Sequence, residues 1–381
     1  MSAASPIVIA GYARSPFTLA KKGGLARVRP DDLAAQVIRE LIARTHVKPE
    51  DIEDIIMGCA FPEGEQGMNV ARLIGLLADL PISVAGMTVN RFCGSSMQSV
   101  HIAAGAIAMG AGEVFICAGV ESMSRIPLGG YNPLFNPALQ AKQPGAYMGM
   151  GDTAENVARQ WQVPREQQEE FAVKSHAKAA AAQAGGHFDA EIVAIRDGKT
   201  VVDKDGCIRA ETTAQVLAGL KPAFDKEGTV TAGTSSPLTD GCAAVLVTTE
   251  AYAERHGLTP LARVRSQAVA GCGPEIMGVG PIVATRKALA RAGIDIGAVD
   301  VVELNEAFSS QAIASMRDIG IREETLNLDG GALALGHPLG ATGARIVGKA
   351  ASLLQRTGGR YALATQCIGG GQGIATVLER V

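Results

Sequence analysis

Residues 89–97 read VNRFCGSSM, and this stretch lies between two patterns of different period. The apolar run 87–89 before it indicates a strand, and the Ala/Gly/Met-rich run 95–109 after it indicates a long helix. A strand that leads through a short loop into a helix is typical of an α/β fold. We therefore expect Cys93 at a helix N-terminus, where unpaired N–H groups and the helix dipole favour a thiolate.

Strand and helix patterns alternate along the rest of the chain. The spacing of Leu33, Val37, Ile38 and Leu41 predicts one apolar face of a helix. Continuous apolar runs predict strands that are buried on both faces and largely parallel to one another. These runs are residues 7–10, 52–58, 87–89, 114–118, 243–247, 262–269, 299–304, 326–328 and 361–365.

Two segments share one order of elements. Residues 87–118 and 326–365 each read as strand, loop, Gly/Ala-rich helix, glycine and strand, which predicts an internal duplication. Residues 123–238 are richer in loops and polar side chains, and we interpret them as an inserted lid-like domain. The predicted division is a first half (1–122, completed by 239–261), the insertion (123–238) and a second half (262–381).

The composition limits the possible functions. The chain has 381 residues, 47% of them apolar and 4% aromatic, with 46 glycines, which is typical of a tightly packed α/β enzyme of two or three domains. A net charge of -3 argues against a nucleic-acid partner. The seven scattered cysteines form no Cys-x-x-Cys pair, so we expect no metal site and a reducing compartment. No apolar run reaches transmembrane length and no targeting segment precedes the first strand, so a cytoplasmic protein is expected.

Later motifs contain residue types that would serve a thiolate. They are NEAF (305–308), GHP (336–338) and CIGGGQG (367–373). His337 could accept a thiol proton, Asn305 could hold a polarised oxygen, and Cys367 is a second thiol. Each also has a plain structural interpretation, as a turn brace, a helix cap and a core residue respectively. Their joint presence favours the catalytic interpretation.

Six motifs, in order along the chain, together resemble those of the thiolase family. They are NRFCGSS (90–96), GVESMS (119–124), TAGTSS (231–236), NEAF (305–308), GHPLG (336–340) and Cys367 followed by the glycines 369–371. The resemblance covers nearly the whole chain. It implies a thiolase-like α/β fold, in which two duplicated βαβαβαββ-type halves stack as five alternating layers (αβαβα) and a loop domain is inserted in the first half.

The resemblance also implies a reaction. A thiolase-like enzyme cleaves a 3-ketoacyl-CoA with a second CoA into acetyl-CoA and a shortened acyl-CoA, so CoA is a substrate and no cofactor is expected. Cys93 would be the acylated nucleophile, and Cys367 would exchange the proton of the enolate carbon. His337, and Asn305 through a water molecule, would hold the enolate oxygen. The N–H groups of Cys93 and Gly369 would hold the later tetrahedral oxyanion.

Further positions match residues that contact the substrate in the family. Arg209 is placed near the adenine nucleotide of CoA and Ser236 along the pantetheine, while Met150 and Met277 match residues that line the acyl pocket. Glu306 is expected to support the NEAF motif from behind. A solvated Arg, a turn Ser and core Met residues are the alternative interpretations.

Two departures from the acetoacetyl-CoA type bear on chain length. That type usually has Cys-Gly-Ser-Gly at the nucleophile, whereas Ser96 follows Cys93-Gly94-Ser95 here. The acetoacetyl-CoA type also usually has a His at the position where this chain has Gly149. Because loss of a bulky side chain makes room for a longer acyl group, the β-oxidation type, a 3-ketoacyl-CoA thiolase, is favoured over an acetoacetyl-CoA thiolase.

Two functions of other classes stay open. One is a CoA-ester or lipid-binding protein without turnover, against which the intact Cys93, Asn305 and His337 argue. The other is a condensing enzyme of the ketoacyl-synthase type, which typically lacks a second Cys before a glycine triplet; Cys367 argues against it. The resemblance further implies a homodimer or homotetramer, with a hydratase/dehydrogenase subunit as a further partner in β-oxidation types.

Overall fold

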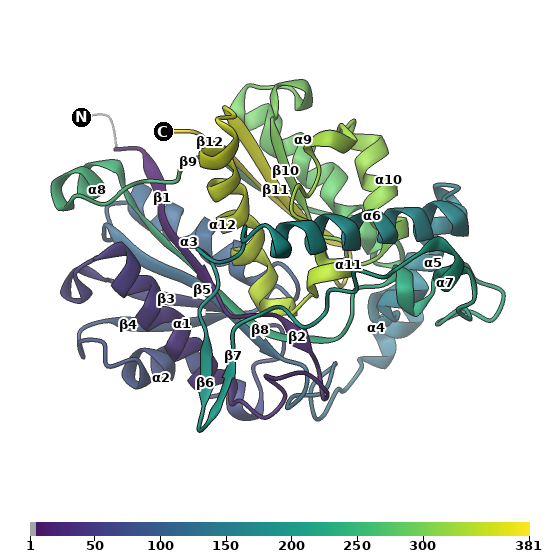
Figure 1. Ribbon diagram of the computed structural model, residues 1–381, viewed down its shortest axis with the longest axis horizontal. Coiled ribbons are helices and arrows are strands. Elements are labelled where there is room, and N and C mark those ends of the chain that lie inside the picture. Colours follow the sequence, from purple (N-terminus) through teal and green to yellow (C-terminus); the bar gives the residue numbers. More distant parts are fainter. Residues whose placement is uncertain (1–4) are drawn as a thin grey trace.

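The computed structural model describes residues 5–381, which form one large mixed sheet covered by helices (Figure 1). Its strands are β1 (Ile7–Arg14), β2 (Thr18–Leu19), β3 (Asp54–Gly58), β4 (Ala85–Val89), β5 (Val114–Ser122), β8 (Thr239–Thr249), β9 (Ala262–Gly271), β10 (Val301–Leu304), β11 (Tyr361–Ile368) and β12 (Gln372–Glu379). The hydrogen-bonded order is β10-β11-β12-β9-β1-β8-β5-β3-β4, and β2 pairs with β8.

Twelve α-helices accompany these strands in the described residues. They are α1 (Pro30–Thr45), α2 (Val70–Leu77), α3 (Ser95–Ala108), α4 (Pro137–Lys142), α5 (Met150–Gln160), α6 (Arg165–Ala184), α7 (Ala214–Ala218), α8 (Glu250–His256), α9 (Gly280–Ala292), α10 (Ser309–Ile319), α11 (Ala332–Leu335) and α12 (Leu339–Thr357).

The strand order confirms the predicted duplication. The first half runs β1-α1-β3-α2-β4-α3-β5-β8, and the second runs β9-α9-β10-α10, a bridge at Leu326, then α12-β11-β12. In each half the same strands pair parallel, β4-β3-β5 in the first and Leu326-β10-β11 in the second. The expected strand at 326–328 is reduced to a single bridge between Leu326 and Val302, because the chain turns away at once.

The side chains of the strands pack into three apolar cores, and these cores lie between five layers of helices and strands. Ile55 and Met57 of β3 pack toward α1 and α2, whereas Ile56 packs toward the central helices α3 and α12. In the second half, Leu363 packs toward α9 and α10. Figure 1 shows α12 in the middle of the molecule, with α1 and α2 on one side and α9 and α10 on the other. The expected αβαβα stacking is confirmed.

The expectation of largely parallel strands was wrong. Seven strand pairings are antiparallel and three are parallel among the described residues. A continuous apolar run indicates that a strand is buried on both faces, but it does not indicate the direction of the strand. Here the helices of the layered stack cover antiparallel strands as well as parallel ones.

The segment between β5 and β8 carries α4 to α7 and a small hairpin of β6 (Ile195–Asp197) and β7 (Thr200–Val202). Its helix α6 packs against α10 and α11 of the second half. The segment therefore lies over the loops that lead into α12. The exact division into 1–122 with 239–261, 123–238 and 262–381 stays a prediction.

Close contact between the halves depends on glycine at position 119. A Cβ there would lie 2.0 Å from the carbonyl oxygen of Gly340 in the first turn of α12. We expect Gly119→Ala to lower the free energy of unfolding by about 2 kcal/mol or more, because neither backbone can yield without separating the halves.

The matched control is Gly105→Ala in α3, where a Cβ meets nothing within 4 Å. It should leave stability unchanged or raise it by up to about 1 kcal/mol. Denaturant unfolding of both variants measures this, and equal midpoints would contradict it.

Candidate active site

The duplication brings Cys93 and His337 to equivalent places. Cys93 lies two residues before α3 begins, and His337 lies two residues before α12 begins. These two central helices are in contact near their first turns: a Cβ at Gly343 would lie 2.2 Å from the backbone nitrogen of Met97. The loops that precede the helices therefore meet at one end of the central layer.

The loop around Cys93 is held tightly. Asn90 Oδ1 accepts a hydrogen bond from the N–H of Phe92 at 2.8 Å, and Phe92 has a φ of 43°, in the left-handed region. Gln366, from β11 of the other half, donates through Nε2 to the carbonyl oxygen of Cys93. Backbone strain at a residue next to a reactive group is a common feature of functional sites.

The Cys93 side chain is buried, and burial raises the pKa of its thiol to about 11. The N–H groups of Gly369 and of Cys93 itself act on the sulfur and oppose this rise. The expectation of a resting thiolate was therefore wrong: the helix N-terminus does not compensate for the lost hydration. A base must remove the proton when the thiol reacts.

Gly369 brings its backbone close to the thiol, as the oxyanion prediction requires. It opens the turn between β11 and β12, and the next two glycines have φ values of 79° and 83°. A Cβ at Gly371 would lie 2.5 Å from the carbonyl oxygen of Cys272, so this turn depends on glycine.

Cys367 lies on β11 and is buried in an apolar cluster. Met150, Met277 and Phe308 belong to the same cluster. The pKa of Cys367 is raised well above its usual value, first by burial and then by the negative charge that Cys93 would carry. This electrostatic coupling places the two thiols near each other. Because the site is apolar, the Cys367 thiol stays protonated until it gives its proton away.

Asn305 and His337 contact each other in the buried interior. Asn305 Nδ2 lies 3.4 Å from His337 Nε2, and His337 Nδ1 lies 2.6 Å from the Thr342 hydroxyl. Since Thr342 donates its hydroxyl hydrogen to the Pro338 carbonyl at 3.0 Å, it accepts from Nδ1. His337 then carries its hydrogen on Nδ1 and leaves Nε2 free to accept one. Burial, with the charge of Arg345, lowers the pKa of His337 to about 3, so the ring is neutral at rest.

Glu306 supports the NEAF motif from behind the site. Its carboxylate accepts from the Ser175 hydroxyl at 2.6 Å, Asn327 Nδ2 at 2.7 Å and the Leu333 N–H at 3.2 Å. A Cβ at Gly331 would lie 2.1 Å from the Glu306 carboxyl carbon, so the neighbouring chain closes around it. The structure thus places Glu306 as a link between the inserted segment and the chain leading to His337.

The two residues predicted for CoA differ in their placement. Ser236 is half-buried, and its N–H donates to the Ala307 carbonyl at 2.9 Å, so it adjoins the NEAF motif. Arg209 is exposed in the outer loop of the inserted segment, where its N–H donates to His176 Nδ1 at 3.1 Å. No contact brings the Arg209 side chain to the two thiols among the described residues.

Sequence reasoning missed three residues that organise the site. Thr342 sets the tautomer of His337, Gln366 holds the Cys93 loop, and Glu121 lies beneath both loops. Glu121 stands within a quoted motif, GVESMS, but nothing in the sequence indicated what it contacts.

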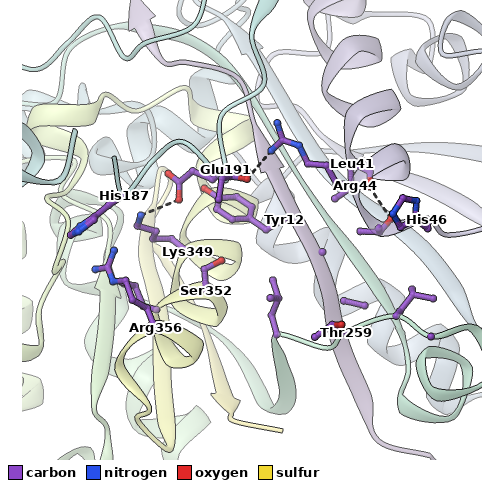
Figure 2. Close-up of a pocket in the computed structure, with 18 residues that line it drawn as sticks. Tyr12, Leu41, Arg44, His46, His187, Glu191, Thr259, Lys349, Ser352 and Arg356 are labelled. Atoms are coloured by element: carbon purple, nitrogen blue, oxygen red, sulfur yellow. Dashed lines mark hydrogen bonds and ion pairs between the residues drawn. The ribbon is translucent and has the colours of Figure 1, made fainter. Parts of the chain in front are cut away.

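A separate cavity of about 460 Å³ lies at the far end of α12 (Figure 2). Basic side chains line it, but protein groups already hold them: Lys349 pairs with Glu191 at 3.0 Å, and Arg44 donates to the Ala190 carbonyl at 2.7 Å. None of the residues lining it belongs to the site around Cys93. We assign the chemistry to the buried thiols and not to this cavity.

The geometry defines a duplicated α/β protein with two neighbouring buried thiols, a neutral histidine and an amide at the junction of its halves. Comparison with known sequences supports this description of the protein. Family models for the N-terminal domain of thiolase match residues 7–251, and those for the C-terminal domain match residues 258–380. The chain belongs to the thiolase family.

Curated relatives match along nearly the whole chain. A 3-ketoacyl-CoA thiolase of Bacillus subtilis (strain 168) is 46% identical, and the match covers 98% of both chains. Proteins of the same name from Marinomonas sp. (strain MWYL1) and Idiomarina loihiensis are each 48% identical, covering 98% of this chain and 98% and 99% of theirs.

Proposed function

We propose that this chain cleaves 3-ketoacyl-CoA with CoA to give acetyl-CoA and a shortened acyl-CoA, as in fatty acid β-oxidation. The observation that carries the proposal is the sequence identity of 46–48% to proteins named 3-ketoacyl-CoA thiolase, over 98% of the chain. The paired thiols of Cys93 and Cys367 support it, because the reaction needs both a nucleophile and a proton donor.

In the proposed first half-reaction the Cys93 sulfur attacks the 3-keto carbon while its proton passes to His337 Nε2. The bond between the second and third carbons then breaks, leaving the acyl group on Cys93 and an acetyl-CoA enolate. His337 and Asn305 stabilise the enolate oxygen, each by roughly 3–4 kcal/mol in a dry site. Cys367 gives its proton to the enolate carbon, and acetyl-CoA leaves.

The second half-reaction restores both thiols. The Cys367 thiolate takes the proton of the incoming CoA, whose sulfur attacks the thioester on Cys93. The N–H groups of Cys93 and Gly369 stabilise the tetrahedral oxyanion. When the intermediate collapses, the Cys93 sulfur recovers its proton from His337 and the shortened acyl-CoA departs. CoA is consumed as a substrate, and the scheme uses no cofactor or metal.

We assign the acyl group to the apolar cluster that holds Met150, Met277 and Cys367. The structure does not support the expected effect of Gly149, because a Cβ there would lie 2.9 Å from the exposed Asp152 carboxylate and not within this cluster. We assign the CoA pantetheine to the side of Ser236 and the adenine nucleotide to Arg209. The latter rests on the motif match and on the exposed position of Arg209.

The acyl chain length separates the proposed function from its alternative. We expect kcat/KM for thiolysis to be higher for 3-ketoacyl-CoAs of about six to ten carbons than for acetoacetyl-CoA, because a longer chain buries more apolar surface in the cluster. Thiolysis rates across a chain-length series measure this. A strong preference for acetoacetyl-CoA would instead favour the acetoacetyl-CoA thiolase.

We further propose that the protein works as a homodimer through the free edge of the sheet. Strand β4 ends the hydrogen-bonded order, and apolar side chains around it are exposed: Met68 is 87% and Ile82 is 78% exposed. An edge of this kind readily pairs with another strand. Light scattering should give twice the chain mass of 39.3 kDa. The mass of a monomer would contradict the proposal, and a mass four times that of the chain or a stable complex with a hydratase/dehydrogenase subunit would extend it.

A cytoplasmic location completes the proposal. All seven cysteines are free thiols, which suits a reducing compartment. Within residues 5–381, no helix combines the length and apolar character needed to cross a bilayer.

A further inference from the structure

Glu121 is buried beneath both catalytic loops, and the mechanism above does not use it. Strand register gives its place in the fold. The last parallel pair of β3 and β5 ends at Gly119, and the last parallel pair of β10 and β11 ends at Thr365. Glu121 and Cys367 each lie two residues further on. The two side chains nevertheless lie on opposite faces of the sheet. Glu121 faces the central helix α12, on the same side as Phe115 and Cys117, whereas Cys367 lies on the side of β11 that faces away from the central helices.

The surroundings of these two residues differ accordingly. Cys367 faces apolar side chains, whereas four N–H donors surround the Glu121 carboxylate. Oε2 accepts from Ala60 and Gly340, each at 2.8 Å, and Oε1 accepts from Gln66 Nε2 at 2.8 Å and from the Phe61 N–H at 3.3 Å. Both oxygens act as acceptors, which is the pattern of an ionised carboxylate. These four donors therefore fix the position of the Glu121 carboxylate.

The partners of Glu121 connect the two catalytic loops. On one side, Asn90 of the Cys93 loop donates through Nδ2 to the Ala60 carbonyl at 3.0 Å, and the Ala60 N–H donates to Glu121. On the other side, Glu121 accepts from Gly340, three residues after His337. The path from Asn90 through Ala60 and Glu121 to Gly340 crosses from the first half of the fold to the second.

The position of Gly340 adds a charge effect. It lies in the first turn of α12, where unpaired N–H groups favour a negative group. Glu121 supplies that charge to α12, and the same charge acts unfavourably on a thiolate at Cys93. Glu121 thus holds the His337 helix at an electrostatic cost to the nucleophile.

We propose that Glu121 is a positioning residue, which sets the separation of Cys93 and His337 by tying their two loops together across the junction of the halves. The inference rests on the roles proposed for Cys93 and His337. Proton transfer between a thiol and a base requires the two groups to lie within hydrogen-bond reach. A carboxylate that is hydrogen-bonded to Gly340 directly and to Asn90 through Ala60 maintains that alignment, whereas apolar packing alone would permit small shifts.

The variant Glu121→Gln tests the proposal because it keeps the shape and removes the charge. Its amide group would face N–H donors of Ala60 or Gly340 and push the loops apart. We expect kcat for thiolysis to fall roughly 10²-fold, as for a misalignment of about 1 Å, with the KM for CoA changed by less than about twofold. Cys93 should at the same time become easier to ionise, because the negative charge that opposes its thiolate is gone. The pH midpoint for its alkylation by iodoacetamide should therefore fall. A purely structural role predicts no such opposite changes.

Two further variants make the outcome decisive. Gln66→Leu removes one donor and keeps the charge, so it should lower kcat several-fold, roughly fivefold to tenfold, and leave the alkylation midpoint unchanged. Glu169→Gln changes a buried glutamate that pairs with Arg165 at 2.6 Å on α6, and should alter neither quantity.

Normal kcat in both Glu121→Gln and Gln66→Leu would overturn the proposal. So would a lower melting temperature of Glu121→Gln with an unchanged alkylation midpoint and a normal kcat per folded molecule. If the unaltered chain shows no thiolysis that depends on Cys93, the proposed function fails instead. An active chain that tolerates both variants rejects only the role of Glu121.

Discussion

Replacing Cys93 with alanine should abolish thiolysis, with kcat falling by at least about 10⁴-fold. The reason is that no other described thiol lies where the acyl group must be transferred. Cys367 is the nearest candidate, but it belongs to the apolar cluster and its pKa is raised well above the usual value. Steady-state cleavage of a 3-ketoacyl-CoA, followed at the thioester, measures the loss.

The matched control is Cys242→Ala, which removes a buried thiol from the outer core of the first half. It should keep nearly the full kcat, although the small cavity will lower stability. Residual activity of Cys93→Ala within about tenfold of the unaltered chain would assign the nucleophile to another residue.

Replacing Cys367 with alanine should separate the two half-reactions. Transfer of an acyl group from a simple acyl-CoA to Cys93 should persist, because CoA can leave as a thiolate without the proton that Cys367 would give it. Cleavage of a 3-ketoacyl-CoA should fall about 10²–10⁴-fold, because the enolate carbon loses its proton donor. Rapid-quench labelling of Cys93 and steady-state thiolysis, measured on one preparation, give the two rates.

Near-normal thiolysis by Cys367→Ala would exclude the proposed acid/base role. Loss of acyl transfer as well would mean that the alanine disturbs the apolar cluster as a whole. Met277→Leu is the control for that disturbance, because it changes packing in the same cluster without removing a proton donor. It should retain both rates and change chiefly the chain-length profile.

Much of the fold could be predicted from sequence because periodicity reports burial directly. The helix predicted from Leu33, Val37, Ile38 and Leu41 is α1, and these four side chains are buried. The duplication was visible because both halves repeat the same order of elements. Strand direction was not predictable from apolar runs, since two covered faces give the same sequence pattern for parallel and antiparallel strands.

The candidate site was predictable as a set of motifs but not as an electrostatic environment. Cys93, Asn305, His337 and Cys367 were found because each falls in a short motif at an element boundary. Their burial depends on the whole layered stack, and it raises the pKa of Cys93 to about 11 and lowers that of His337 to about 3. A local helix terminus suggested a thiolate, but the loss of water outweighs that local effect.

These two opposite shifts have a mechanistic consequence. With a neutral thiol and a neutral imidazole at rest, Cys93 and His337 carry no charge until substrate arrives. The proton must then move from Cys93 to His337 as the sulfur attacks, and the negative charge reaches the enolate oxygen near Asn305 when the carbon–carbon bond breaks. The account therefore depends on a covalent acyl group at Cys93.

Mass spectrometry of the protein mixed with a 3-ketoacyl-CoA, in the absence of free CoA, tests this most directly. The account predicts one acyl group per chain on the peptide that contains Cys93, shorter by two carbons than the substrate acyl group. Adding CoA should remove it and release the matching acyl-CoA. Thiolysis at a normal rate without this adduct, or with the adduct on another residue, would contradict the account.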